Sequence, residues 1–153
     1  MPGPEGLDGK RSRQRRSGDP LSYCAPVQKH QLAGRENAGL AAFEKDFLPE
    51  AALYASARPL RSQTTGQFIE RMNGLVGKTL HSLEETILGS RIHVFGNVAV
   101  AVIACENVEN ATETNRNVEM MLLVKDDGSW RVAAQAWDRQ DAANPVTSEL
   151  WER

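Results

Sequence analysis

The sequence predicts an α+β fold, with helices in its first half and an antiparallel meander of strands in its second half. Apolar residues recur at helical spacing before residue 77, whereas three runs rich in Val, Ile and aromatic residues follow at 91–106, 116–125 and 130–138. Such side chains suit a pleated, half-buried surface, and turn signals separate the runs. A chain of 153 residues is long enough for one domain with its own core.

Residues 1–30 are expected to form a disordered basic extension, followed by a single domain at 31–148 and a C-terminal tail at 149–153. The first 22 residues hold three prolines and four glycines, and almost nothing apolar to bury. They also carry a basic cluster of Lys10, Arg11, Arg13, Arg15 and Arg16. The apolar stretch of an export signal does not follow this cluster, so we expect a cytoplasmic protein.

The first predicted helix is Gly34–Leu48, where apolar residues lie at helical spacing and Pro49 ends the pattern. A short strand is expected next, at Leu53–Ala57. Tyr54 lies in it and has two interpretations, because a buried phenol can donate to a ligand or can be a core tyrosine at a strand edge.

A second helix is predicted at Ser62–Gly77, where the apolar residues form one stripe. Thr64 or Thr65 can cap its N-terminus, and Gly77 can end it. Leu83–Leu88 is a further strand candidate. Glu84 and Glu85 are adjacent there, so they point to opposite faces and cannot act together as acid and base.

One face of the meander is apolar. With side chains alternating at period two, we expect the even-numbered face to pack on a core and the mixed odd-numbered face to be wetter. A three-residue turn that pairs Asp126 with Trp130 would place positions of like parity on one face, with Val118 opposite Asp138. The even positions are Val94, Val98, Val100, Val102, Val118, Met120, Leu122, Val124, Trp130, Val132, Ala134 and Ala136.

Three charged residues are expected to meet at one end of this sheet. Glu106 ends the first run, Arg116 begins the second and Asp138 ends the third, and all three fall on the even face. There they can line the mouth of a cavity and orient a ligand. A solvated cluster of ion pairs that closes the sheet end is the alternative.

Composition argues against several classes of partner. A formal net charge of −2 disfavours a dedicated nucleic-acid binder, although the basic arm leaves such a contact open. The sequence has no apolar run near the roughly 20 residues of a membrane span. Cys24 and Cys105 form no metal motif, and His30, His81 and His93 share no ligand spacing. We therefore expect neither a metal nor a cofactor.

The order of these elements resembles the nuclear-transport-factor-2-like superfamily, and within it the SnoaL-like small domains. The resemblance covers residues 35–148 and includes Phe95-Gly-Asn-Val-Ala-Val100 and Asp127-Gly-Ser-Trp-Arg-Val132. It implies a cone-shaped, cystatin-like sheet wrapped on N-terminal helices, with an internal pocket and a homodimer formed through the open sheet face.

The resemblance also implies a function. Members that isomerise ketosteroids use an aspartate near the first strand, whereas Tyr54 has no such neighbour here. The Asp-Arg-Asp sets of hydrolysing members are echoed only in residue type by Glu106, Arg116 and Asp138.

We therefore expect a pocket for a small apolar or polar-headed ligand, with Tyr54, Met120 and Trp137 as binding residues. Any catalysis would be a metal-free isomerase, cyclase or dehydratase step. Glu106 or Asp138 would be the base, and Arg116 would stabilise an oxyanion. The alternative is a dimerisation or protein-interaction domain without enzymatic activity.

Overall fold

A computed structural model describes residues 44–75 and 77–152. The expected basic extension at 1–30, Cys24 and His30 lie outside the described residues, as does most of the helix predicted at 34–48. In the described part the fold is α+β, as the sequence predicts. No helix of this part is long and apolar enough to cross a membrane.

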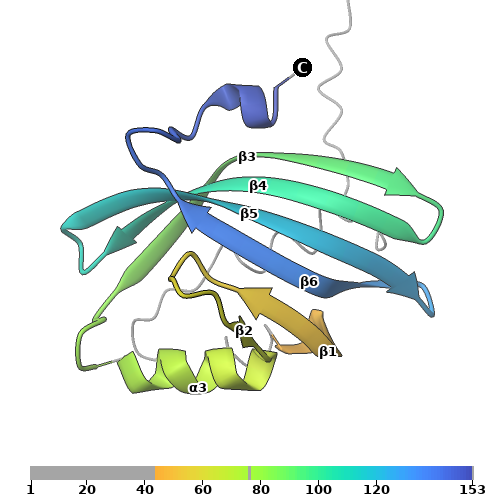
Figure 1. The fold of residues 1–153 in the computed structure, drawn as a ribbon, viewed down its shortest axis with the longest axis horizontal. Helices are drawn as coiled ribbons and strands as arrows, with labels where there is room; N and C mark the ends of the chain where they lie inside the picture. Colours follow the sequence, from red (N-terminus) through yellow and green to blue (C-terminus); the bar gives the residue numbers. More distant parts are fainter. Residues whose placement is uncertain (1–43, 76, 153) are drawn as a thin grey trace, which may run out of the picture.

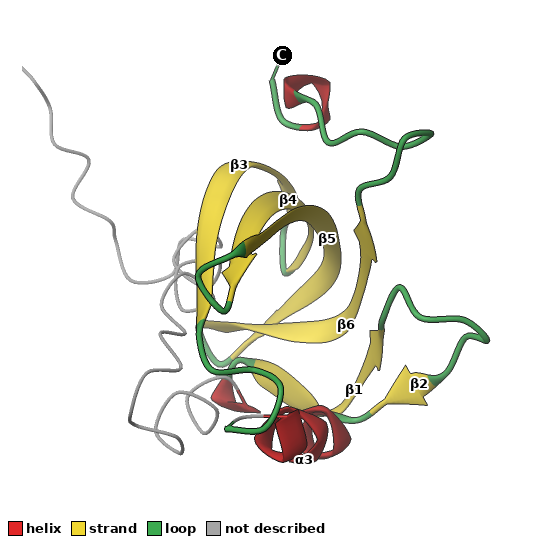
Figure 2. Ribbon diagram, turned by 90° about the vertical axis from the view of Figure 1, so that its left-hand side faces the viewer, coloured by secondary structure: helices red, strands yellow, loops and turns green. Residues whose placement is uncertain are grey.

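Six strands form one curved mixed sheet in the order β2-β1-β6-β5-β4-β3 (Figure 1). Four long strands form an antiparallel meander, and β1 joins β6 in parallel. Figure 2 shows that the meander is strongly curved and that the helix α3, Thr65–Leu75, lies beneath the strands at the β1 end. The strands are β1 Phe47–Tyr54, β2 Ser62–Gln63, β3 Leu83–Phe95, β4 Val98–Glu109, β5 Glu113–Asp126 and β6 Ser129–Arg139.

Strand β1 starts earlier than the sequence predicts. Phe47 and Leu48, read as the end of a helix, already belong to this strand, which ends at Tyr54 and not at Ala57. Pro49 can lie within β1 because the pairing of β1 with β6 is irregular between Phe47 and Ala52, where a backbone N–H is not required. Phe47 and Leu53 are buried on the side that faces the core, so tertiary packing outweighed the local helical spacing.

The helix α3, Thr65–Leu75, confirms the second predicted helix. Thr64 caps it: its Oγ1 accepts a hydrogen bond from the Gln67 amide at 3.1 Å, and the Gln67 side chain accepts from the Thr64 amide at 2.9 Å. This is a reciprocal capping box. Gly77, with φ of 77°, follows the helix in the left-handed conformation that a helix end favours.

The first predicted strand run, 91–106, contains a turn. β3 continues from the strand candidate at 83–88 to Phe95, and the chain reverses at Gly96-Asn97 before β4 begins. Gly96 has a φ of 57°, which a residue without a side chain adopts readily. The meander therefore has four strands and not three.

The predicted faces are inverted in β4 and β5. Odd positions such as Ile103, Cys105 and Leu123 are buried, whereas Val100 and Leu122 are 48% and 46% exposed. We call the odd side of β4 and β5 the inner face and the even side the outer face. The prediction is wrong because it assumed that the more apolar side must face the core of the same chain.

The register of β5 and β6 explains why part of the prediction still holds. The hairpin has a two-residue turn, pairing Asp126 with Ser129, and a bulge then shifts the register between Leu122 and Leu123. Before the bulge the even positions of β6, such as Trp130, are buried; after it the odd positions take their place. The turn is one residue shorter than predicted, and the bulge shifts the register back by one residue. Val118 therefore lies opposite Asp138, as expected.

The core lies between the inner face and the segments β1 and α3. Phe47 and Leu53 pack with Ile103, Leu123 and Trp130, and residues of α3 cover this cluster from below. Burial of such side chains contributes roughly 1.5–3 kcal/mol each. The sheet thus holds its hydrophobic core on one side only.

The C-terminal segment covers part of the outer face. The 3-10 helix η2, Ser148–Leu150, lies above β3, on the side of the sheet opposite α3 (Figure 1). A Cβ at Gly89 would collide with the indole ring of Trp151, so the ring packs directly against the glycine backbone. Ala104, the cross-strand partner of Gly89, is fully buried even though it belongs to the outer face.

Candidate functional site

A groove of about 650 Å³ lies on the outer face where β1, β6 and β5 meet. Its floor is a cross-strand row, because Tyr54 pairs with Ala136 and Ala136 pairs with Met120. Val118 and Asp138, which also pair with each other, extend this floor. The groove is therefore mostly apolar, with a phenol and a carboxylate at its edge.

The loop after β1 forms the wall of the groove. Ala55, Arg58 and Leu60 line it, and Leu60 is 57% exposed. The guanidinium of Arg58 donates from Nη1 to the carbonyl oxygens of Ala55, Ser56 and Ala57 at 3.1–3.2 Å. The backbone of the loop thus folds around the Arg58 guanidinium. Its apolar residues Ala55 and Leu60 line the groove.

Four of the residues predicted from the sequence line this groove together. They are Tyr54, Met120, Trp137 and Asp138. Trp137 also contacts the helix, since its ring meets Phe68 edge-on at a centroid distance of 5.9 Å. Trp137 pairs across the strands with Glu119, so its ring lies on the side of the sheet that α3 covers.

Glu106 and Arg116 lie on the same outer face but are not among the groove residues. They are cross-strand partners, and Arg116 Nε donates to Glu106 Oε2 at 2.9 Å. The side chain of Arg116 is 42% exposed and that of Glu106 is 31% exposed. Asp138 accepts a hydrogen bond from the amide of Arg139, and among the described residues no ion pair joins it to Arg116. The structure brings two of the three charged residues into contact and places the third in the groove.

A second polar cluster lies on the inner face, where the sequence analysis expected none. Glu85 on β3, Cys105 on β4 and Glu119 on β5 place their ligand atoms within 4.8 Å of one another. Glu119 is only 7% exposed and Cys105 is fully buried. We call these three residues the inner cluster.

The pKa values of the two carboxyl groups in the inner cluster are raised strongly. Burial, and to a smaller extent the charge of Glu119, raises the pKa of Glu85 to about 8. Burial also raises the pKa of Glu119 to about 7. Desolvation disfavours the charged form of each group, so near neutral pH the pair holds a proton that ordinary carboxyl groups would have lost.

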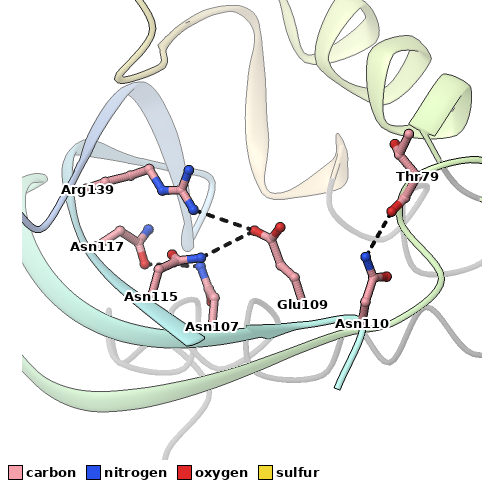
Figure 3. Close-up of polar contacts among 7 residues, drawn as sticks. All are labelled: Thr79, Asn107, Glu109, Asn110, Asn115, Asn117 and Arg139. Atoms are coloured by element: carbon pink, nitrogen blue, oxygen red, sulfur yellow. Dashed lines mark hydrogen bonds and ion pairs between the residues drawn. The ribbon is translucent and has the colours of Figure 1, made fainter. Parts of the chain in front are cut away.

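Amide side chains lie between the inner cluster and the rim of the sheet (Figure 3). We call them, together with two charged residues at the rim, the polar strip; its members are Asn107, Asn115, Asn117, Glu109 and Arg139. Asn107 Nδ2 donates to Asn117 Oδ1 at 3.2 Å. Farther out, Asn115 Nδ2 donates to Glu109 Oε1 at 3.4 Å, and Arg139 Nη2 lies 4.0 Å from the same oxygen. Figure 3 shows the Arg139 and Asn115 side chains converging on Glu109.

The inner cluster was not predicted because the odd face was expected to face solvent. Glu85 was considered only beside its neighbour Glu84, which does point to the opposite face and is exposed. The available signal was that Glu119 alternates with Met121 and Leu123 on one side of β5. A carboxyl group in such a stripe must be either buried or functional.

Comparison with known proteins gives a family and a fold. The family described as "Putative lumazine-binding" matches residues 25–138. A search of curated proteins gives no match.

Solved structures with a similar fold include an NTF-2-like protein of unknown function from Pseudomonas aeruginosa, with a TM-score of 0.62 and 16% identity over 79% of this chain and 94% of that one. A "Putative Scytalone Dehydratase" from Novosphingobium aromaticivorans has a TM-score of 0.59 and 12% identity, over 82% and 87%. A ketosteroid isomerase-like protein from Erwinia carotovora atroseptica has a TM-score of 0.54 and 18% identity, over 79% and 90%.

These identities are low, so the solved structures show the fold alone. They confirm the fold that the resemblance to the nuclear-transport-factor-2-like superfamily implies. The cystatin-like fold named from the sequence is also borne out, because a Caulobacter vibrioides protein with that fold has a TM-score of 0.58 at 16% identity.

Proposed function

Since the chain belongs to the family described as "Putative lumazine-binding", we propose that it binds a small, largely apolar, polar-headed molecule in the groove beside β1. The observation that carries this proposal is the groove of about 650 Å³, which is within the usual range of small-molecule sites. Its lining is mostly apolar with few polar groups, as in sites that bury a ligand and fix its orientation.

A planar heterocycle of the lumazine type suits this groove. The floor of Val118, Met120 and Ala136 offers a flat apolar surface on the sheet, on which a ring system can lie. The Asp138 carboxylate can accept from ring N–H groups, and the Tyr54 hydroxyl can donate to a ring carbonyl oxygen. The family description and the residues present therefore favour the same class of ligand.

A catalytic role is the finer part of the proposal. Asp138 reaches the groove without an ion-pair partner among the described residues and is the candidate base for an isomerase, cyclase or dehydratase step. Arg116 is the candidate for stabilising an oxyanion, because it lies on the same face two positions along β5 from the groove residue Val118 and is held there by Glu106. The names of the dehydratase and isomerase-like structures agree with this class of chemistry, but only as a likeness of fold.

Binding tests the proposal most directly. We expect lumazine or a related pteridinedione to raise the melting temperature of the wild type. Asp138→Asn should weaken binding by about tenfold or more, since a hydrogen bond to a charged group contributes roughly 1.5–3 kcal/mol. Tyr54→Phe should weaken it less, because only a neutral bond is removed.

Asp126→Asn is the matched control, because Asp126 is exposed at the far hairpin of the same sheet. Equal affinity of Asp138→Asn, Tyr54→Phe and the control would exclude the groove as the binding site. Met120→Trp should fill the floor and abolish binding while leaving the fold intact.

A second function is supported by the open part of the outer face. Val98, Val100, Met120 and Leu122 are each about half exposed, and together they form an apolar surface on β4 and β5. Apolar surfaces of this kind mark interaction sites, and a second copy of this chain is the partner we propose. Met120 belongs to both the surface and the groove, so dimer formation would close one side of the groove.

Leu122→Glu tests the dimer by placing a charge at the centre of this surface. We expect it to convert a dimer into a monomer in sedimentation velocity. Thr112→Glu, in the exposed turn between β4 and β5, should leave the dimer unchanged. A wild type that sediments as a monomer at high concentration would refute the proposed self-association.

A further inference from the structure

The inner cluster has the composition of a metal site. Glu85, Cys105 and Glu119 come from three neighbouring strands, and the pairing of Ile87 with Cys105 and of Ile103 with Glu119 places them on a diagonal across the inner face. Each offers one ligand atom, and the three atoms lie within 4.8 Å of one another. Strand pairing alone brings these atoms together, so the backbone fixes the geometry.

Unpartnered buried oxygens point to a missing ligand. Glu119 is more than nine-tenths buried, and its Oε2 has no hydrogen-bond partner in the part of the chain that the structure describes. Oε1 of Glu85 is also buried and has no hydrogen-bond partner among the described residues. Burying a carboxyl oxygen without a partner costs several kcal/mol or forces it to stay protonated, and a cation between the two groups would remove that cost.

We propose that Glu85, Cys105 and Glu119 bind a divalent cation of borderline softness, with Zn²⁺ as the best match. A thiolate and two carboxylates are ligands that zinc takes in proteins. Tetrahedral coordination at the usual bond lengths separates ligand atoms by about 3.5 Å, so small side-chain rotations would close the site. The fourth position can be taken by water or by Asn107 Oδ1, another buried oxygen without a partner among the described residues.

The polar strip of Figure 3 runs from the rim of the sheet toward the proposed site. It begins at Glu109 and Arg139, whose side chains are 33% and 57% exposed. It continues through the hydrogen-bonded pair Asn107 and Asn117 toward Glu85. Amide and carboxyl oxygens of this strip are groups that a cation can take as ligands.

Cobalt provides the sharpest test, because a thiolate bound to Co²⁺ gives a charge-transfer band in the near ultraviolet. Chelator-treated full-length protein is titrated with Co²⁺ and then with Zn²⁺. We expect a band that saturates at one equivalent and disappears when Zn²⁺ replaces Co²⁺. The two cysteines of the chain allow a matched comparison: Cys105→Ser should lose the band, and Cys24→Ser should keep it.

Glu119→Gln separates the metal site from a structural cluster. It keeps the shape of the side chain, removes one charged ligand and should weaken Co²⁺ binding at least about tenfold. Its affinity for a groove ligand should change much less than its affinity for Co²⁺, since Trp137 is the groove residue that pairs with Glu119 and the floor of the groove lies on the other face. Absence of the band in the wild type, its survival in Cys105→Ser, or equal Co²⁺ affinity in Glu119→Gln would each overturn the proposal and leave Glu85 and Glu119 as a pair that shares a proton.

Discussion

Replacing Glu119 by glutamine should stabilise the protein at neutral pH and flatten the dependence of its stability on pH. In the folded state burial raises the pKa of Glu119 to about 7 and that of Glu85 to about 8. In the unfolded state both titrate near their ordinary value of 4.5. Between these values the folded protein holds protons that the unfolded chain has lost.

The sign and the size of the effect follow from proton linkage. The stability is highest when both groups are protonated in both states, below about pH 4.5, and it decreases as the pH rises toward 7 and 8. Each proton held only by the folded state lowers the free energy of unfolding by about 1.4 kcal/mol per pH unit. The pair therefore gives a slope of up to about 2.7 kcal/mol per pH unit, and Glu119→Gln should reduce it to about half.

Urea denaturation between pH 5 and 8, with a chelator present, measures this slope. Glu84→Gln is the matched control, because Glu84 is the exposed neighbour of Glu85 on the same strand and points to the other face. The control should follow the wild type at every pH. Parallel pH profiles for the wild type and Glu119→Gln would refute the conclusion that the inner carboxyl pair is held protonated in the folded state.

Three further predictions concern the packing of side chains and one partly exposed ion pair. Leu123→Ala should cost about 2–5 kcal/mol of unfolding free energy, because Leu123 is 1% exposed; Leu122→Ala, at 46% exposure, should cost less than about 1 kcal/mol by the same measurement. Gly89→Ala should displace the indole of Trp151, which a red shift of tryptophan emission and a lower melting temperature would report. Glu106→Gln should change the unfolding free energy by no more than about 1 kcal/mol, since its ion pair is partly exposed.

The fold was predictable because local signals determine most of it. The capping box at Thr64, the β-rich runs and the Asp127-Gly128 turn are encoded within a few residues each. The direction of the faces is not local. It depends on which side β1 and α3 cover, and an outer face with Val100 and Leu122 is as apolar as the inner one.

The groove was partly predictable for a related reason. Tyr54, Met120 and Trp137 were predicted as binding residues and Asp138 as a catalytic residue, and all four are among the residues that line the groove. Met120 and Asp138 were predicted to lie on the even face that packs on the core, although that face turned out to be the outer one. The inner cluster was out of reach, because its carboxyl pair is formed by residues 34 positions apart that only the strand pairing brings together.

The parallel pairing of β1 with β6 has a consequence for the order in which the domain assembles. Strands β3 to β6 follow one another by short connections, whereas Phe47 pairs with Val132 across 85 residues of chain. Contacts of short sequence separation form faster, so we expect the meander to form first and β1 to attach to its edge late. The groove is built along that seam, with its floor on β1, β6 and β5 and its wall on the loop that follows β1. Local opening of β1, detectable as early hydrogen exchange, would then dismantle the binding site while the rest of the sheet stays folded.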